Sequence, residues 1–497
     1  MSVQDTRTRN LAPMAPATAV PSPATGRGDR WRLLAMLTVV GASMMDLLDS
    51  TIVNIAGPAL RQDIGASTSA LQWIVAGYTL AFASVLITGA RLGDVLGRKR
   101  MFLTGMAGFV ASSVLCSAAI NAQMLIATRV TQGAFAAVMI PQGLGLIRAM
   151  YPPEQMAKAF AVFGPVMGIS ATAGPVVGGA LVDGNLLGLG WRTIFLLNVP
   201  VGLLALAGAA RLLPADARRG SRAGAPRLDL AGLMLATAAA LLLVYPLVQG
   251  REAGWPGWAF GMMAASVPAF GIFALHQRAR RRAGRDPLVE TSIWRKREFS
   301  SGVAFVMLFF GSMTGMFFAL TLFMQFGQHF TPLHAGLTTL PWSLGGIVSM
   351  GASQGLLGKC GPRRVMQAGV AVMAAGLLGI AWTIHHLGIA VTSWGLAPSL
   401  FAAGFGMGLV FTPFFGTVLA AVKDHEVGSA SGVVNAVQQF GSAFGVAGLG
   451  TLFFDRVASH GASAAAAPVF VITAGTLAVA WVIAFLMPKT ARADQLG

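Results

Sequence analysis

Residues 33–55 read LLAMLTVVGASMMDLLDSTIVNI. This stretch is long and apolar enough to cross a bilayer as a single helix, because a span needs roughly 20 mainly apolar residues. Similar runs fill most of the 497-residue chain, which is 55% hydrophobic and 11% charged, with a mean hydropathy of +0.68. Soluble domains carry about a quarter charged residues. The sequence therefore predicts an all-α integral membrane protein and excludes a water-soluble globular domain.

Fourteen runs of this kind divide the chain, and we expect each of them to be a transmembrane helix. The turn GARLGDVLGRKR (89–100) has a shorter echo in GLLGKCGPRR (355–364), a weak internal repeat of the kind found in transporters. We therefore expect a six-helix bundle over 31–211, an inserted helix pair over 229–275 and a second six-helix bundle over 299–487. The predicted spans are 33–55, 71–90, 101–120, 123–147, 159–182, 193–211, 229–249, 257–275, 299–323, 335–357, 365–386, 394–421, 430–454 and 467–487.

The basic residues predict the orientation of these spans. Thirty of the 35 Lys and Arg residues fall on one side of the predicted topology, and that side is the cytoplasm by the positive-inside rule. We expect a multi-pass protein of the inner (cytoplasmic) membrane, with a disordered cytoplasmic tail over 1–30 and a second one over 488–497. The net charge of +17 is then an orientation signal and does not indicate nucleic-acid binding. The basic cytoplasmic loop 276–298 is a candidate contact for anionic lipid, with a plain solvated loop as the alternative.

Two carboxyl groups lie well inside the first predicted span. Asp46 and Asp49 are three residues apart and so share one face of the helix. Burial disfavours the charged form of a carboxyl group, so such a group can bind and release protons near neutral pH. We expect a proton site with Asp49 as the main carrier and Asp46 as the second choice; a purely structural role in a wet cavity is the alternative.

Arg129 is the single basic residue deep inside a predicted span. An unpaired guanidinium at this depth is costly, so we expect a partner in the bundle interior: backbone carbonyls, Gln132 or a first-span aspartate. Such a pair would link proton binding to the movement of helices, and a static ion pair is the alternative.

Small residues predict close contacts at two places. The fifth predicted span contains GISATAGPVVGGAL (168–181), in which Gly174, Pro175, Gly178 and Gly179 permit tight packing and a bend. The turn over 89–100 carries Asp94, Gly97 and Arg98, a combination suited to a cytoplasmic latch between helices. Polar residues at span depth are candidates for lining a substrate cavity, with ordinary helix-end solvation as the alternative: Asn54, Gln325, Gln354, Asn435 and Gln438.

These motifs resemble those of the major facilitator superfamily, and more narrowly those of its fourteen-helix drug:proton antiporters. The resemblance covers nearly all of residues 30–490. It rests on LLDSTIVNIAGPAL (47–60), the turn over 89–100, LIATRVTQGAFAA (125–137), the glycine-rich fifth span and WRTIFLLNVPVG (191–202). It implies a two-bundle fold that works by alternating access, with Arg129 acting in proton transfer and the fifth-span motif associated with export.

The chain also departs from that pattern. Ala90 stands where the turn motif usually has glycine, and Val95 stands where it usually has arginine, which weakens the expected latch. The tenth span lacks the acidic residue that some multidrug members use for dications. The resemblance then favours monovalent lipophilic cations, neutral compounds or a dedicated antibiotic as substrates.

We expect a secondary transporter, not an enzyme: a proton-coupled antiporter that exports small amphipathic drugs or antibiotics. An importer or uniporter of a small metabolite on the same scaffold is the first alternative, and a non-transport membrane scaffold is the second. No His/Cys cluster has metal-site spacing, and no phosphate-binding glycine loop precedes a Lys-Ser/Thr pair. We therefore expect no catalytic residues, no metal and no cofactor, with the proton gradient as the energy source.

Overall fold

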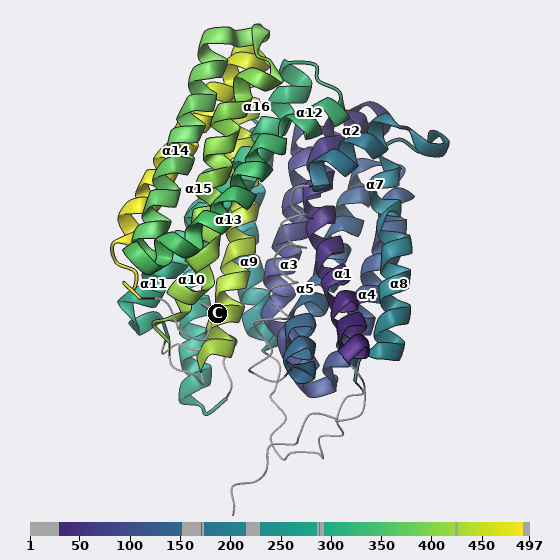
Figure 1. Cartoon of the computed structure of the whole chain (residues 1–497), viewed down its shortest axis with the longest axis vertical. Coiled ribbons are helices and arrows are strands. Elements are labelled where there is room, and N and C mark those ends of the chain that lie inside the picture. Colours follow the sequence, from purple (N-terminus) through teal and green to yellow (C-terminus); the bar gives the residue numbers. More distant parts are fainter. Residues whose placement is uncertain are drawn as a thin grey trace, which may run out of the picture.

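The computed structural model describes residues 29–151, 170, 173–214, 229–285, 288, 293–422 and 426–490. The described residues form helices joined by short turns, and no strand occurs among them (Figure 1). This confirms the all-α fold class predicted from the composition. Most of the predicted tails and of the fifth span lies outside the described residues, as do residues 286, 287 and 289–292 of the loop 276–298.

The first part of the chain forms one group of helices. Its first element, α1, begins at Asp29 and so takes in the last two residues of the predicted tail. A short 3-10 segment, η1, interrupts the first predicted span before α2 begins. The elements are α1 (Asp29–Ile52), η1 (Val53–Ala56), α2 (Gly57–Ile64), α3 (Thr68–Leu96), α4 (Arg98–Ser117), α5 (Ala122–Met150), a helix over Ala173–Asp183, η3 (Leu186–Gly188), α7 (Arg192–Leu196) and α8 (Asn198–Leu212).

The second part of the chain begins with a helical hairpin and continues into a second group. A π-helical turn, η5, ends α11, and the last helix, α16, is broken at Gly461, which has a φ of 79°. The elements are α9 (Leu230–Gln249), α10 (Gly257–Arg282), η4 (Ile293–Arg295), α11 (Arg297–Leu322), η5 (Phe323–Gly327), α12 (Pro332–Thr338), α13 (Leu340–Cys360), α14 (Pro362–Leu387), η6 (Gly388–Ala390), α15 (Ser393–Leu419) and α16 (Val427–Ala484).

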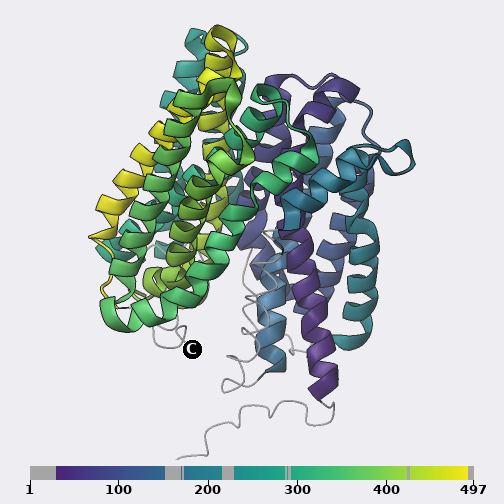
Figure 2. The same cartoon turned by 45° about the horizontal axis from the view of Figure 1, so that its top comes forward.

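The two groups stand side by side in Figure 1 and Figure 2, the first in purple and blue and the second in green and yellow. In the first group α5 packs against α3 and α4, and α8 packs against α1 and α4. In the second group α11 packs against α16, and α15 packs against α13 and α14. Helix α16 also packs against α3, and the α9–α10 hairpin contacts both groups through α9. The hairpin therefore lies beside the seam between the groups.

Glycine lets α11 and α16 approach closely. A Cβ atom on Gly315 would overlap the backbone of Gly445, and one on Gly445 would overlap the backbone of Gly311. The glycine-rich stretch 428–450 therefore packs tightly against α11. This contact holds α11 against the first part of α16.

Within the described ranges, eleven helices are long and apolar enough to cross a membrane. The predicted spans 335–357 and 430–454 are also helical, in α13 and in the first part of α16, but they are not among those eleven. The fifth predicted span, 159–182, is described only from residue 173 on, apart from Ser170. Fourteen crossings therefore stay a prediction.

Candidate functional site

A buried ion pair lies at the centre of the first helix group. The Nη1 atom of Arg129 on α5 lies 2.5 Å from Oδ2 of Asp49 on α1. Arg129 is 1% exposed and Asp49 is 2% exposed, so neither charge reaches bulk solvent. Removing one partner of such a pair leaves an uncompensated charge, which typically costs about 3–5 kcal/mol. The predicted interior partner of Arg129 is thus an aspartate of α1.

Hydrogen bonds from α5 and α8, supported by Ser113 of α4, complete the environment of this pair. The second oxygen of Asp49, Oδ1, accepts from Nε2 of Gln132 at 3.0 Å and from Nδ2 of Asn198 at 2.7 Å. Both amide groups also donate to Oγ of Ser113, on α4, at 2.8 and 3.2 Å. The carboxylate of Asp49 therefore receives donors from α5 and α8 besides its ion pair, and burial is compensated on each oxygen.

Arg129 uses every kind of partner that the sequence predicted. Its Nε donates to the backbone carbonyl of Ile74 at 3.2 Å, and its Nη1 donates to Oε1 of Gln132 at 2.6 Å as well as to Asp49. The guanidinium carbon lies 4.2 Å from the centre of the Tyr78 ring. A guanidinium over an aromatic face gains a further electrostatic attraction when it is desolvated. Arg129 therefore joins α1, α3 and α5 at one point.

Asp46 belongs to the same cluster but has different surroundings. It is half-buried, and Oδ1 of its carboxyl group accepts a hydrogen bond from the Tyr78 hydroxyl. Asp46 and Asp49 are one helical turn apart. The Tyr78 ring faces Arg129, which pairs with Asp49, and the Tyr78 hydroxyl donates to Asp46. Tyr78 therefore connects the surroundings of the two carboxyl groups. The cluster of Asp46, Asp49, Tyr78 and Arg129 thus holds two carboxyl groups with unequal access to water.

The sequence did not identify Tyr78, Ser113 or Asn198 as members of this cluster. Tyr78 is one of three tyrosines in the chain, and Asn198 is an isolated polar residue in the apolar stretch WRTIFLLNVPVG. Those two features were visible as signals of a buried polar role. Ser113 carried no such signal, since serines near helix surfaces are common in membrane spans.

The glycine-rich motif of the fifth span packs against both groups. Cβ atoms on Gly174 and Gly178 would press on Thr51 and Ile52 of α1, and one on Gly179 would overlap the backbone of Pro332 on α12. Conversely, a Cβ atom on Gly336 would overlap the backbone at Pro175. The amide of Leu333 also donates to Oδ2 of Asp183 at 2.9 Å. The motif therefore forms a close contact between the helix over Ala173–Asp183 and α12, one from each group.

The turn motif over 89–100 forms a sharp bend between α3 and α4. Gly97 has a φ of 102°, a conformation that disfavours any side chain. Arg98 lies against Gly145 of α5, and Nζ of Lys99 donates to the carbonyls of Ala210 and Leu213 at 2.8 Å. The predicted bend at Gly97 is confirmed. The side chain of Asp94 lies outside the described part, so its latch role stays a prediction.

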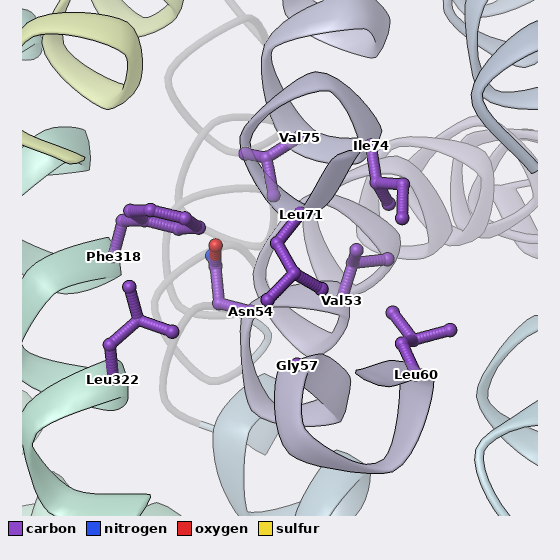
Figure 3. A pocket seen from close by; sticks show the side chains of 9 residues that line it. All are labelled: Val53, Asn54, Gly57, Leu60, Leu71, Ile74, Val75, Phe318 and Leu322. Atoms are coloured by element: carbon purple, nitrogen blue, oxygen red, sulfur yellow. The ribbon is translucent and has the colours of Figure 1, made fainter. Parts of the chain in front are cut away.

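The residues predicted to line a substrate cavity do not all line the same cavity. Asn54 lines a cavity of about 10 Å³, close to the space of one water molecule, between η1, α3 and α11. Figure 3 shows its amide facing Phe318 and Leu322 across that cavity, and its Oδ1 has no hydrogen-bond partner in the described part of the chain.

The other candidates lie elsewhere. Gln325 is 6% exposed in the π-helical turn η5, and neither amide atom has a partner among described residues. Asn435 donates to the carbonyl of Ser431 within its own helix, and Gln438 is half-buried. The side chain of Gln354 is not among the side chains that the structure describes. Of the candidates, Asn54 and Gln325 thus keep unused polar atoms in the interior.

The described residues contain no group of three or more His, Cys, Asp or Glu side chains that could hold a metal ion. The cluster around Asp49 contains proton-binding and hydrogen-bonding groups only.

Comparison with known proteins agrees with this architecture. Residues 39–446 match the Major Facilitator Superfamily. The chain is 46% identical to a Streptomyces coelicolor protein named "Probable actinorhodin transporter", over 87% of this chain and 74% of that one. It is 34% identical to "Puromycin resistance protein pur8" of Streptomyces alboniger, over 97% and 96% of the two chains.

Solved structures show the same fold at low sequence identity. A POT family transporter in complex with 5-aminolevulinic acid has a TM-score of 0.65 and 13% identity, with 94% of this chain and 97% of that chain covered. The family match over residues 39–446 and the two Streptomyces relatives are consistent with the helical fold described above. This chain belongs to the major facilitator superfamily and is a membrane transporter, not an enzyme.

Proposed function

We propose that the chain is a proton-coupled antiporter that exports small amphipathic compounds, antibiotics among them, across the cytoplasmic membrane. Relatives named for actinorhodin transport, for tetracenomycin C resistance and export and for puromycin resistance support the substrate class. The motifs support membership of the fourteen-helix drug:proton antiporters. The single observation on which proton coupling rests is the 2.5 Å ion pair between Asp49 and Arg129, shielded from solvent within the membrane-spanning helices.

Protonation of Asp49 would change the forces on α1. The neutral carboxyl group no longer attracts Arg129, and one of its oxygens becomes a donor where two amides now donate to it. Since Asp49 lies one turn before η1, a shift of α1 reaches the 3-10 segment Val53–Ala56 and the cavity wall at Asn54. A 3-10 stretch within a longer helix is a common hinge. Proton binding in the first group is thereby linked to the contact of η1 with α11.

Asp46 gives the proton a route to Asp49. Asp46 is half-buried, whereas Asp49 is almost fully enclosed, and Tyr78 contacts both the Asp46 carboxyl group and Arg129. We infer that a proton reaches Asp46 first and that the Tyr78 hydroxyl reorients when it does. Asp49 remains the group whose charge state governs Arg129.

The two helix groups would be the two halves that rock against each other. In this conformation one end is held closed by the contact of Gly179 with Pro332 and of Gly336 with Pro175. That end is opposite to the basic loops, which by the positive-inside rule face the cytoplasm together with both termini. The conformation is then one in which the outer end is shut, and substrate would enter from the cytoplasm.

Efflux assays in a host that lacks its own pumps test this function. Cells that express the chain should accumulate less of at least one amphipathic dye or antibiotic, and a protonophore should abolish the difference. Uphill uptake into inverted vesicles distinguishes export from import. A protonophore-resistant export, or uptake by right-side-out vesicles, would contradict the proposal.

A further inference from the structure

A second, larger cavity opens at the same end of the molecule as the Gly179–Pro332 contact. It has a volume of about 390 Å³, which falls within the range of small-molecule sites. Helix α2, the start of α3, the α9–α10 turn, η5 and α16 all contribute to it. Its lining residues are Arg61, Thr68, Arg251, Phe326, Phe453, Phe454, Val457 and Ala462. We call this cavity the outer vestibule.

The outer vestibule combines aromatic walls with two guanidinium groups. The guanidinium carbon of Arg61 lies 5.8 Å from the centre of the Phe326 ring, and that of Arg251 lies 5.6 Å from the centre of the Phe454 ring. Phe453 and Phe454 are buried and line the cavity. Each arginine is thus held over an aromatic face at the edge of an otherwise apolar space.

The charge balance of the vestibule is positive. Arg251 shares its charge with Glu252 at 3.7 Å, but that carboxylate already accepts from the amide and hydroxyl of Ser69 and from the hydroxyl of Thr68. The Nε–H of Arg251 is buried and has no partner among the described residues. Among the described residues Arg61 forms no ion pair. Arg192, which the predicted topology also places on the outer side, pairs with Asp63.

Burial alone would raise the pKa of the Glu252 carboxyl. The hydrogen bonds from Ser69 and Thr68 nevertheless hold this pKa below its usual value. Glu252 therefore stays charged near neutral pH and holds Arg251 in place. Among the residues that the structure describes, no carboxylate pairs with Arg61, so its positive charge in the vestibule has no counter-charge there.

We propose that the outer vestibule binds an aromatic anion, with the ring against Phe453 and Phe454 and the anionic group between Arg61 and Arg251. A carboxylate or phenolate there would accept charge-assisted hydrogen bonds from the guanidinium groups of Arg61 and Arg251. The edge-to-face pair of Phe453 and Phe454, with ring planes at 71°, would contact the ring. Both helix groups contribute to the site, so the bound anion stabilises the conformation in which this end is closed.

A binding measurement on the purified full-length protein in detergent tests this site without requiring transport. The probe is 1-naphthoate, compared with its neutral isostere 1-naphthamide by equilibrium dialysis. We expect 1-naphthoate to bind at least tenfold more tightly. Arg61→Gln should weaken 1-naphthoate binding about tenfold and leave 1-naphthamide binding unchanged. Arg456→Gln, which changes the charge equally but lies outside the lining, should alter either affinity less than twofold.

The lipid headgroup is the competing source of an anion. Repeating the dialysis in nanodiscs of phosphatidylcholine and of phosphatidylglycerol separates the two sources. Equal binding in both nanodiscs supports a soluble aromatic anion. Loss of 1-naphthoate binding in phosphatidylglycerol would assign the vestibule to lipid and overturn the proposal, as would equal losses in Arg61→Gln and Arg456→Gln. Efflux without 1-naphthoate binding would refute this site alone, and binding without efflux would refute export alone.

Discussion

The guanidinium carbon of Arg129 lies 4.2 Å from the centre of the Tyr78 ring, and the hydroxyl of that same ring donates to Asp46. One aromatic side chain therefore contacts both the buried cation and the more accessible of the two carboxyl groups. This arrangement allows a change of charge at Asp46 to be felt at Arg129 without a direct contact between them.

Replacing Tyr78 separates its two contacts. Tyr78→Phe keeps the ring under Arg129 and removes the donor to Asp46, whereas Tyr78→Leu removes both. We expect proton-driven efflux to fall several-fold in Tyr78→Phe and further in Tyr78→Leu, because a desolvated cation–π contact contributes about 2 kcal/mol. Initial efflux rates at equal amounts of membrane-inserted protein measure this order. Equal rates in the two variants would show that the ring itself has no role.

Arg129→Lys keeps the charge and loses the planar fork. A lysine cannot reproduce the separate donors to Ile74, Asp49 and Gln132, since it presents one ammonium group in place of a rigid guanidinium. We expect protons to leak without substrate movement. The ratio of protons to substrate in reconstituted vesicles should rise above the wild-type ratio, and an unchanged ratio would contradict a coupling role.

Gly179→Ala should weaken the closed outer end. The added methyl group would lie 2.6 Å from Cα of Leu333, and backbone cannot move aside as a flexible side chain can. Overpacking of this kind costs about 1–3 kcal/mol. The labelling test uses a cysteine at position 54 in a background that carries Cys360→Ser. With Gly179→Ala added, this cysteine should react with an external, membrane-impermeant maleimide about tenfold faster than in the parent that retains Gly179.

The matched control for this labelling is Gly448→Ala, because a methyl group at Gly448 meets no atom within 4 Å. Its labelling rate should equal that of the parent. The native Cys116 is buried and should stay unlabelled in both variants. Identical rates for Gly179→Ala and Gly448→Ala would rule out the proposed closure.

Asp229 should stabilise the α9–α10 hairpin. Burial would raise the pKa of its carboxyl, but donors from His276, Gly232 and Gln277 outweigh burial and keep this pKa below its usual value. A lowered pKa means that the stabilisation is present above about pH 4 and is lost as the pH falls further. Asp229→Ala also removes the N-cap of α9, so we expect a loss of about 1–2 kcal/mol.

Thermal unfolding in detergent measures this effect at two pH values. At pH 7 Asp229→Ala should melt below the wild type, and near pH 3 the difference should shrink. The exposed acid Asp455 provides the control, because Asp455→Ala should unfold at the same temperature as the wild type at both pH values. A difference between Asp229→Ala and wild type that is independent of pH would assign the whole effect to packing.

The sequence predicted the long helices well and their interruptions poorly. Apolar runs determine where a span lies, so α3, α5 and α14 coincide with predicted spans to within several residues. The 3-10 segment at Val53 and the π-helical turn at Phe323 were not predicted, whereas the break at Gly461 falls in the predicted gap between spans 430–454 and 467–487. The two features that were missed contact neighbouring helices, and local composition does not encode such contacts.

The residues of the candidate site were likewise predicted only in part. Arg129 was singled out because a lone cation in a span needs a partner, and the residue types of its partners followed from that requirement. Asn198 and Tyr78 were missed because their roles depend on helices that come together only in the fold. Asn435 was selected for its polarity, yet its amide bonds within its own helix.

In the proposed mechanism the carboxyl groups of Asp46 and Asp49 carry the coupled protons. Substrate transport by purified protein in vesicles under an imposed pH gradient tests this, with Asp46→Asn and Asp49→Asn combined in one chain. We expect gradient-driven accumulation to fall to the level of protein-free vesicles while substrate exchange without a gradient persists. Accumulation at the wild-type rate in this double variant would refute proton transfer through these two groups.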